Sequence, residues 1–187
     1  KRIGSFDDDL QALLRDDPEA EFGMNATYGL TSNLTLDATY NPDFSQVEAD
    51  ASQIAVNERF ALFFPEKRPF FLEGTDVFSM PRQLVYTRSI ASPVGAAKLA
   101  GKLGSLSVAY IGAVDGIHGG ADNPVVNLLR VKRDVGGSSS VGMVYTDRTI
   151  LGEQFNRVVG ADGRFVLAQR YTVELLAAAS ADRRPGS

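Results

Sequence analysis

The sequence predicts an all-β protein that folds as an antiparallel, up-and-down sheet. Apolar and polar residues alternate with a period of two in segments spread over most of the chain, which is the pattern of a strand with one apolar face. Charged residues inside these segments fall almost entirely on the parity opposite the apolar one. Short turns at 31–33, 102–104, 136–138 and 168–170 alternate with longer polar connections at 115–124 and 147–156.

The composition excludes several classes of protein. Hydrophobic residues make up 44% of the 187 residues and charged residues 22%, so the chain is not a disordered tail. No apolar run approaches the roughly 18 residues that a membrane-spanning helix needs. A net charge of -4 argues against a nucleic-acid partner. The absence of cysteine removes disulfides, thiolate metal ligands and cysteine nucleophiles.

The first two expected strands form a hairpin. Residues 20–30 alternate strictly, and 34–40 repeat the pattern after a short turn at Thr31, Ser32 and Asn33. One face of the hairpin is apolar: it carries Ala20, Phe22, Met24, Ala26, Tyr28 and Leu30 from the first strand, and Leu34, Leu36, Ala38 and Tyr40 from the second.

A polar and aromatic insert at 41–74 interrupts the alternation. Pro65 and Pro69 bracket an acidic and basic triplet, and proline cannot donate a hydrogen bond to a sheet, so 65–69 should be a fixed turn. Phe70 and Phe71 then return to an apolar environment. Alternation resumes after the insert and predicts further strands over 97–102, 105–114, 125–132, 141–145, 159–167 and 171–177.

The expected organisation is a polar lead-in at 1–19, a β-barrel segment at 20–180 that contains the insert, and a loop or tail at 181–187. The start of the chain has no apolar core of the length that a signal peptide requires. We therefore expect the sequence to be a piece of a longer protein, and the barrel to be partial.

Two architectures fit the alternation equally well. In a transmembrane barrel the apolar parity faces lipid, the polar parity faces the lumen, and short turns lie at one rim with longer loops at the other. In a soluble β-sandwich the same apolar parity points inward to a core. The pattern alone leaves both open.

The charged residues of the insert are the candidate site. Paired carboxylates could serve glycoside hydrolysis or bind Ca²⁺, but the spacing lacks the ligand alternation and glycine of an EF-hand loop. The favoured interpretation is a network of ion pairs, because unpaired charges are costly to bury. We predict that this network faces the lumen and contains Asp43, Glu48, Asp50, Arg59, Glu66, Lys67, Arg68 and Glu73.

No catalytic, cofactor-binding or metal-binding residue is predicted. His118 is the single histidine and lies in a glycine-rich stretch, where an exposed loop residue is expected. Without a second histidine or any cysteine, neither a zinc site nor a serine–histidine triad is expected.

Two long motifs carry a resemblance to a known family. Residues 28–50 (YGLTSNLTLDATYNPDFSQVEAD) and 63–74 (FFPEKRPFFLEG) resemble a bacterial outer-membrane β-barrel family of unknown function. Its members usually carry this barrel after an N-terminal family-9-type carbohydrate-binding domain. Shorter matches lie at 84–88, 97–102, 129–134 and 160–164, so the resemblance spans roughly 25–175.

The resemblance favours the barrel over the sandwich and implies a location in the bacterial outer membrane, with membrane lipid as a partner. It carries no established catalytic residues. The implied role is non-enzymatic passage or surface handling of a ligand, with a glycan-derived ligand as the expected class. The alternatives are a carboxylate-based glycoside hydrolase at the barrel mouth and a soluble β-sandwich that binds carbohydrate.

Overall fold

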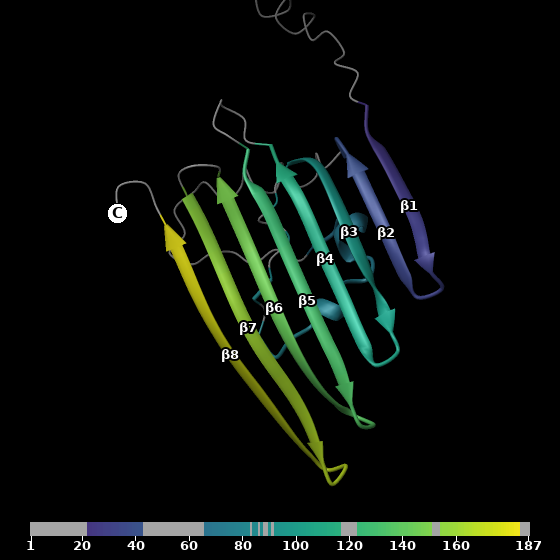
Figure 1. Ribbon diagram of the computed structural model, residues 1–187, viewed down its shortest axis with the longest axis vertical. Coiled ribbons are helices and arrows are strands. Elements are labelled where there is room, and N and C mark those ends of the chain that lie inside the picture. The colour runs from purple at the N-terminus through teal and green to yellow at the C-terminus, as the bar shows by residue number, and fades with distance from the viewer. Residues whose placement is uncertain are drawn as a thin grey trace, which may run out of the picture.

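The described part of the chain forms one antiparallel sheet. The computed structural model describes residues 22–42, 66–82, 84–85, 87, 90, 92–116, 123–150 and 154–183. These residues form a single eight-stranded sheet in which the strands follow one another in chain order (Figure 1). Every neighbouring pair is antiparallel, as the alternation predicts.

The later strands are longer than the first two, and two short helices lie between the second and third strands. The helices are α3 (Pro69–Leu72) and the 3₁₀ helix η1 (Thr75–Phe78). The strands are β1 (Met24–Thr31), β2 (Leu34–Tyr40), β3 (Pro93–Leu103), β4 (Leu106–Asp115), β5 (Val125–Val135), β6 (Ser139–Ile150), β7 (Gln154–Leu167) and β8 (Tyr171–Arg183).

The sheet is curved and open. β1 and β8 are its two edges, and they lie at opposite ends of the strand order (Figure 1). The prediction of an all-β, antiparallel, up-and-down fold is confirmed, and an open curved sheet is consistent with part of a barrel.

The hairpin turns lie at one end of the sheet. The turns at 32–33, 104–105, 136–138 and 168–170 all fall at the lower end in Figure 1. Gly104 and Gly136 adopt φ values of 62° and 65°, where a side chain would be strained. The connections at the opposite end include the long one between β2 and β3.

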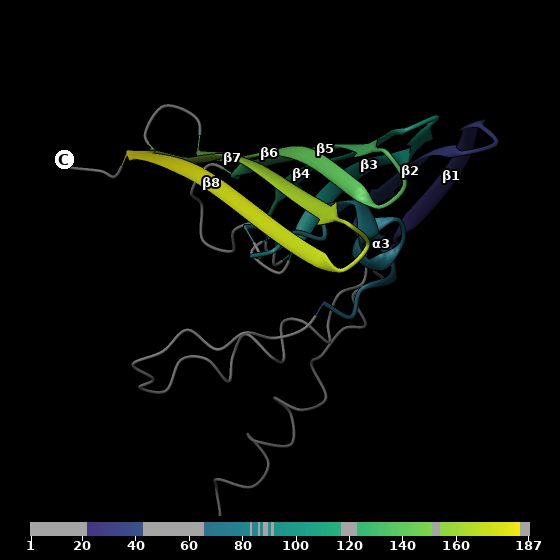
Figure 2. The same cartoon turned by 90° about the horizontal axis from the view of Figure 1, so that it is seen from below.

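The two faces of the sheet differ in what covers them. We call the described residues between Glu66 and Ile90 the inner segment, and the face that they contact the inner face. Figure 2 shows α3 against one side of the sheet, and the described residues place no helix on the other side. Cross-strand partners share a face, so the register assigns the row Asp37, Lys98, Ile111 and Leu128 to the inner face. We call the opposite side the outer face.

Apolar packing holds the inner segment on the inner face. Phe71 is 1% exposed and belongs to one cluster with Ile90 and with side chains from four strands. Burial of such a phenylalanine contributes roughly 1.5–3 kcal/mol. The sheet contributes Ala96, Ile111, Ala113, Val126, Leu128 and Val144 to this cluster.

The strands extend beyond the predicted ranges. β6 and β7 continue through 147–150 and 154–156, so the prediction of a long connection at 147–156 is wrong. Polar residues pair there: Asp147 lies opposite Arg157, and the arginine Nε donates to the carboxylate at 2.9 Å. Residues 181–183, which were expected in the tail, are the last residues of β8.

Candidate functional site

Arg68 joins the two ends of the inner segment through hydrogen bonds. The residue lies just before α3 and is 3% exposed. Its Nε and Nη2 atoms donate to the two carboxylate oxygens of Glu66, each at 2.8 Å. The same guanidinium donates to the backbone carbonyls of Ile90 at 2.6 Å and Thr87 at 2.9 Å. It also lies 4.1 Å from the centre of the Phe71 ring, a cation–π distance.

Glu66 is held as a carboxylate. Burial alone would raise its pKa, but hydrogen bonds from Arg68 and Thr87 outweigh burial and lower the pKa to about 2. The Thr87 hydroxyl donates to Oε2 at 2.6 Å, and the backbone N–H groups of Lys67 and Arg68 donate to Oε1 at 3.1 Å. A carboxyl group with this pKa is ionised at neutral pH, so it is poorly suited to donate a proton as a general acid.

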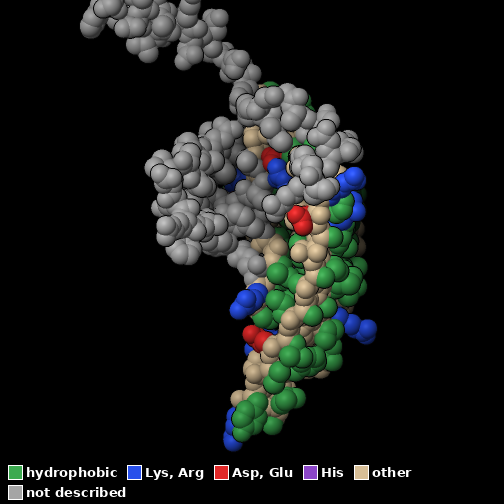
Figure 3. All heavy atoms as spheres, turned by 90° about the vertical axis from the view of Figure 1, so that its left-hand side faces the viewer, with side chains coloured by type: hydrophobic (Ala, Val, Ile, Leu, Met, Phe, Trp, Pro, Cys, Tyr) green, Lys and Arg blue, Asp and Glu red, His purple; other side chains and the backbone are tan. Residues whose placement is uncertain are grey.

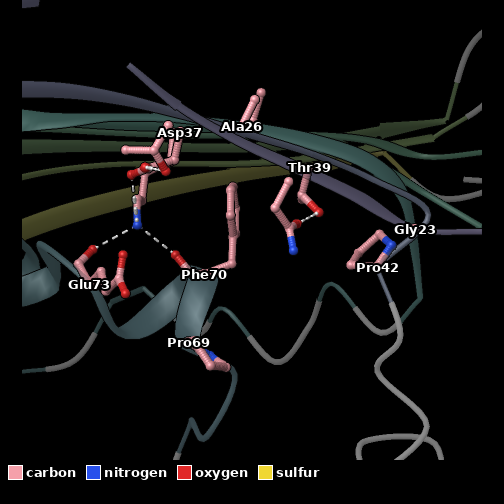
Figure 4. A pocket seen from close by; sticks show the side chains of 12 residues that line it. Gly23, Ala26, Asp37, Thr39, Pro42, Pro69, Phe70 and Glu73 are labelled. Atoms are coloured by element: carbon pink, nitrogen blue, oxygen red, sulfur yellow. Dashed lines mark hydrogen bonds and ion pairs between the residues drawn. The ribbon is translucent and has the colours of Figure 1, made fainter. Parts of the chain in front are cut away.

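Lys98 ties the inner segment to β3. Its side chain is almost fully buried, and Nζ donates to the carbonyls of Phe70 at 2.7 Å and Glu73 at 2.9 Å. These are carbonyls near the end of α3, where a cation is favourable. Nζ also lies 3.2 Å from Oδ2 of Asp37 on β2. Dashed lines in Figure 4 mark these contacts.

Arg130 ties the inner segment to β5 and crosses β6 to reach β7. It is fully buried, and its Nε donates to the carbonyl of Val77 in η1 at 3.2 Å. Its two terminal nitrogens form a bidentate ion pair with Asp162, with Nη2 at 2.9 Å from Oδ2. Gly142 on β6 makes room for this crossing, because a Cβ there would lie 2.6 Å from Nη1.

The three buried cations share one arrangement. Arg68, Lys98 and Arg130 each bond to a carboxylate and also donate to backbone carbonyls of the inner segment. A buried cation without such partners would be destabilising. The charges on the inner face therefore fix the path of the inner segment across the sheet.

Two cavities lie between the inner segment and the wall formed by β1 to β4. The first has a volume of about 580 Å³ and is lined by Asn25, Thr39 and Phe70 among others (Figure 4). The second has a volume of about 710 Å³ and reaches Gly104 and Ser107 at the hairpin end. Both volumes fall in the range of ligand-binding clefts. The two cavities share Thr27, Asp37, Glu73 and Lys98.

Neither a metal centre nor a membrane-spanning helix is found in the described residues. No three His, Cys, Asp or Glu side chains among them gather in a group that could hold a metal ion. The part of the chain that the structure describes also contains no helix long and apolar enough to cross a membrane.

The structure brings together two of the eight residues of the predicted network. Glu66 and Arg68 form the ion pair described above. Lys67 is exposed and takes part through its backbone N–H, and Glu73 takes part through its carbonyl, not its carboxylate. The other four, Asp43, Glu48, Asp50 and Arg59, lie outside the described residues.

Sequence reasoning did not select the sheet residues of the network. Lys98, Arg130 and Asp162 lie on the parity opposite the apolar one, but nothing in the alternation says what they contact. A lysine or arginine at a strand centre, opposite an apolar parity, was the available signal for a partner on the inner face.

Comparison with known proteins adds one match. Residues 12–103 match a family described as Domain of unknown function (DUF5916). The matched range includes β1, β2, the inner segment and β3. No curated protein matches the chain. No solved structure matches it.

Proposed function

We propose that this sheet is part of a β-barrel in a bacterial outer membrane. In this proposal the outer face contacts lipid, the inner face lines the lumen, and the inner segment partly fills that lumen. The barrel serves non-enzymatic passage or surface handling of a ligand, with the glycan-derived class implied by the family resemblance.

One row of side chains carries the proposal. The register links a continuous outer row across all eight strands, and every member is apolar or tyrosine. Large members such as Tyr28 and Val159 are 67% and 48% exposed, and Figure 3 shows hydrophobic side chains gathered along this side of the sheet. The outer row consists of Tyr28, Leu36, Leu99, Tyr110, Leu129, Tyr145, Val159 and Ala179.

The height of the apolar region matches a membrane. On β8, alternate residues from Tyr171 to Ala181 are apolar or tyrosine, which is about 33 Å along a strand at about 3.3 Å per residue. With a strand tilt of about 40°, this length spans roughly 25 Å, the height of the apolar band of outer-membrane barrels. The same reasoning gives roughly 20 Å for Leu106 to Val114 on β4.

The inner face supports the same orientation. It carries the buried charges Asp37, Lys98 and Arg130, whose partners lie on the inner segment and on other strands. A soluble sandwich would need a second layer on the apolar outer face, because a continuous apolar surface of this extent is rare on a soluble monomer. In the proposal, lipid supplies that layer.

The glycoside hydrolase alternative receives less support. Its general acid would need a raised pKa, and the most buried acid of the insert in the described residues, Glu66, has a lowered one. No observation in the described residues favours the hydrolase, so the non-enzymatic role is the one we put forward.

The experiment compares folding in buffer with folding in detergent micelles. We expect the far-UV circular dichroism of a sheet, and a heat-shifted band in SDS gels, only when micelles are present. Met143→Arg on the outer face should then weaken folding by about 2–4 kcal/mol, the cost of a mid-bilayer arginine. Ser138→Arg places the same charge in an exposed turn and is the matched control.

Folding without micelles would refute the membrane proposal. Cooperative folding in plain buffer, with Met143→Arg as stable as Ser138→Arg, would mean that water covers the outer face, and a soluble binding module would become the leading function.

A further inference from the structure

We infer that the two cavities beside β1 to β4 form one groove, and that this groove is a solute path that favours cations over anions. The inference rests on the proposed membrane function, because a path needs a barrier to cross. It adds the location of the path and the charge of the solutes that it admits.

The lining residues place the groove along the strands. Gly23 and Pro42 line the first cavity at the end of the sheet that carries the long connections. Gly104 and Ser107 line the second cavity at the hairpin end. The cavities meet where Lys98 bridges the sheet and α3. Together they follow the wall from one end of the sheet to the other.

Small polar side chains cover much of the wall. Asn25, Thr27 and Thr39 line the first cavity, and Thr35 and Ser107 line the second. Hydroxyl and amide groups can replace the hydration of a polar solute without binding it tightly. Such a wall suits the passage of hydrated solutes better than tight binding.

The charges of the lining are unequal. The basic residues Lys98 and Lys102 each lie beside a carboxylate, Asp37 at 3.2 Å and Asp134 at 2.5 Å, so their charges are balanced. Two further acidic side chains, Glu73 and Asp76, line the second cavity and are exposed. Neither has a basic partner among the described residues.

Among the described lining residues, these two unbalanced acids give the groove a negative potential. A unit charge about 7 Å away in water changes the energy of an ion by roughly RT, which alters its local concentration about threefold. Glu73 lines both cavities and lies at their junction. An anion moving through the groove therefore meets a barrier at the point where a cation is attracted.

The test measures the reversal potential of the full chain in planar lipid bilayers under a tenfold KCl gradient. One double variant, Glu73→Gln with Asp76→Asn, removes both charges and leaves the backbone contacts of these residues intact. Glu174→Gln is the matched control, because Glu174 lies on β8 away from both cavities. A heat-shifted band in SDS gels confirms that each variant is folded.

We expect a potassium-to-chloride permeability ratio of about three or more at low salt. The ratio should fall towards one in the double variant and stay unchanged in the control. A ratio near or below one in the parent protein overturns the inference, and so does a change in Glu174→Gln as large as that in the double variant. Either result leaves the proposed passage function in place. Conductance no higher than that of lipid alone overturns the passage function, and the inference with it.

Discussion

Replacement of Arg68 by methionine should break the contacts that Arg68 makes within the inner segment. Methionine keeps an apolar contact with Phe71 but removes every donor of the guanidinium. The Glu66 carboxylate, whose side chain is 13% exposed, loses its ion pair. The carbonyls of Thr87 and Ile90 lose a hydrogen bond each.

Two arguments give the same magnitude. Hydrogen bonds from Arg68 and Thr87 together lower the pKa of Glu66 from 4.5 to about 2 in the fold against the effect of burial, which corresponds to roughly 3 kcal/mol for all of its contacts combined. Independently, removal of one partner from a buried ion pair costs about 3–5 kcal/mol, because the remaining charge is left uncompensated. We therefore expect Arg68→Met to lower the free energy of unfolding by about 3 kcal/mol.

The assay is a urea titration of the folded protein, with hydrogen exchange as a local readout. The amides of Phe71 and Leu72 donate to the Arg68 carbonyl at 3.0 and 3.1 Å, so they report directly on this turn. Arg82→Met is the matched control, because Arg82 is exposed on the same inner segment. Glu66→Gln combined with Arg68→Met should recover most of the loss, since no uncompensated charge remains.

The reasoning would be refuted by a loss below about 1 kcal/mol in Arg68→Met, the level typical of exposed ion pairs. It would also be refuted by a double variant that is no more stable than the single one, because the two residues would then act independently.

Three further predictions follow from the same contacts. Glu66 has a pKa below its unfolded value, so its contribution to the free energy of unfolding should be complete above about pH 4.5 and disappear as the pH falls towards 2. Urea titrations across this range should show the loss of stability in the parent protein and much less of it in Arg68→Met. Gly142→Ala should cost about 1–3 kcal/mol, because its Cβ would displace the Arg130 guanidinium, and an equal cost in an Arg130→Met background would contradict this explanation. Lys98→Met should speed hydrogen exchange at the Glu73 amide, which bonds to the Pro69 carbonyl, and protection as strong as in the parent would show that Lys98 does not anchor α3.

Much of the fold could be predicted because strand alternation is a local signal. The range 34–40 coincides with β2, and the predicted cores of the other strands lie within or largely overlap the observed ones. The ends were missed where polar residues pair with each other. Asp147 falls in the predicted loop at 147–156, but its ion pair with Arg157 extends β6 and β7.

The candidate site could be predicted only where its contacts are local. Glu66 and Arg68 are two residues apart, so their ion pair was foreseeable from the sequence. The bonds from Lys98 to Phe70 and from Arg130 to Val77 join residues 28 and 53 positions apart. Such contacts depend on how the inner segment lies across the sheet, which periodicity does not encode.

Quenching of single tryptophans by brominated lipid tests the central claim most directly, because the chain contains no tryptophan. Val159→Trp places the probe on the outer row, and Ser107→Trp places it on the inner face beside the second cavity. For protein reconstituted in vesicles, the account predicts strong quenching of Val159→Trp and little quenching of Ser107→Trp. Equal quenching at both positions, or quenching of Val159→Trp only by acrylamide in the water, would contradict a lipid-facing outer row.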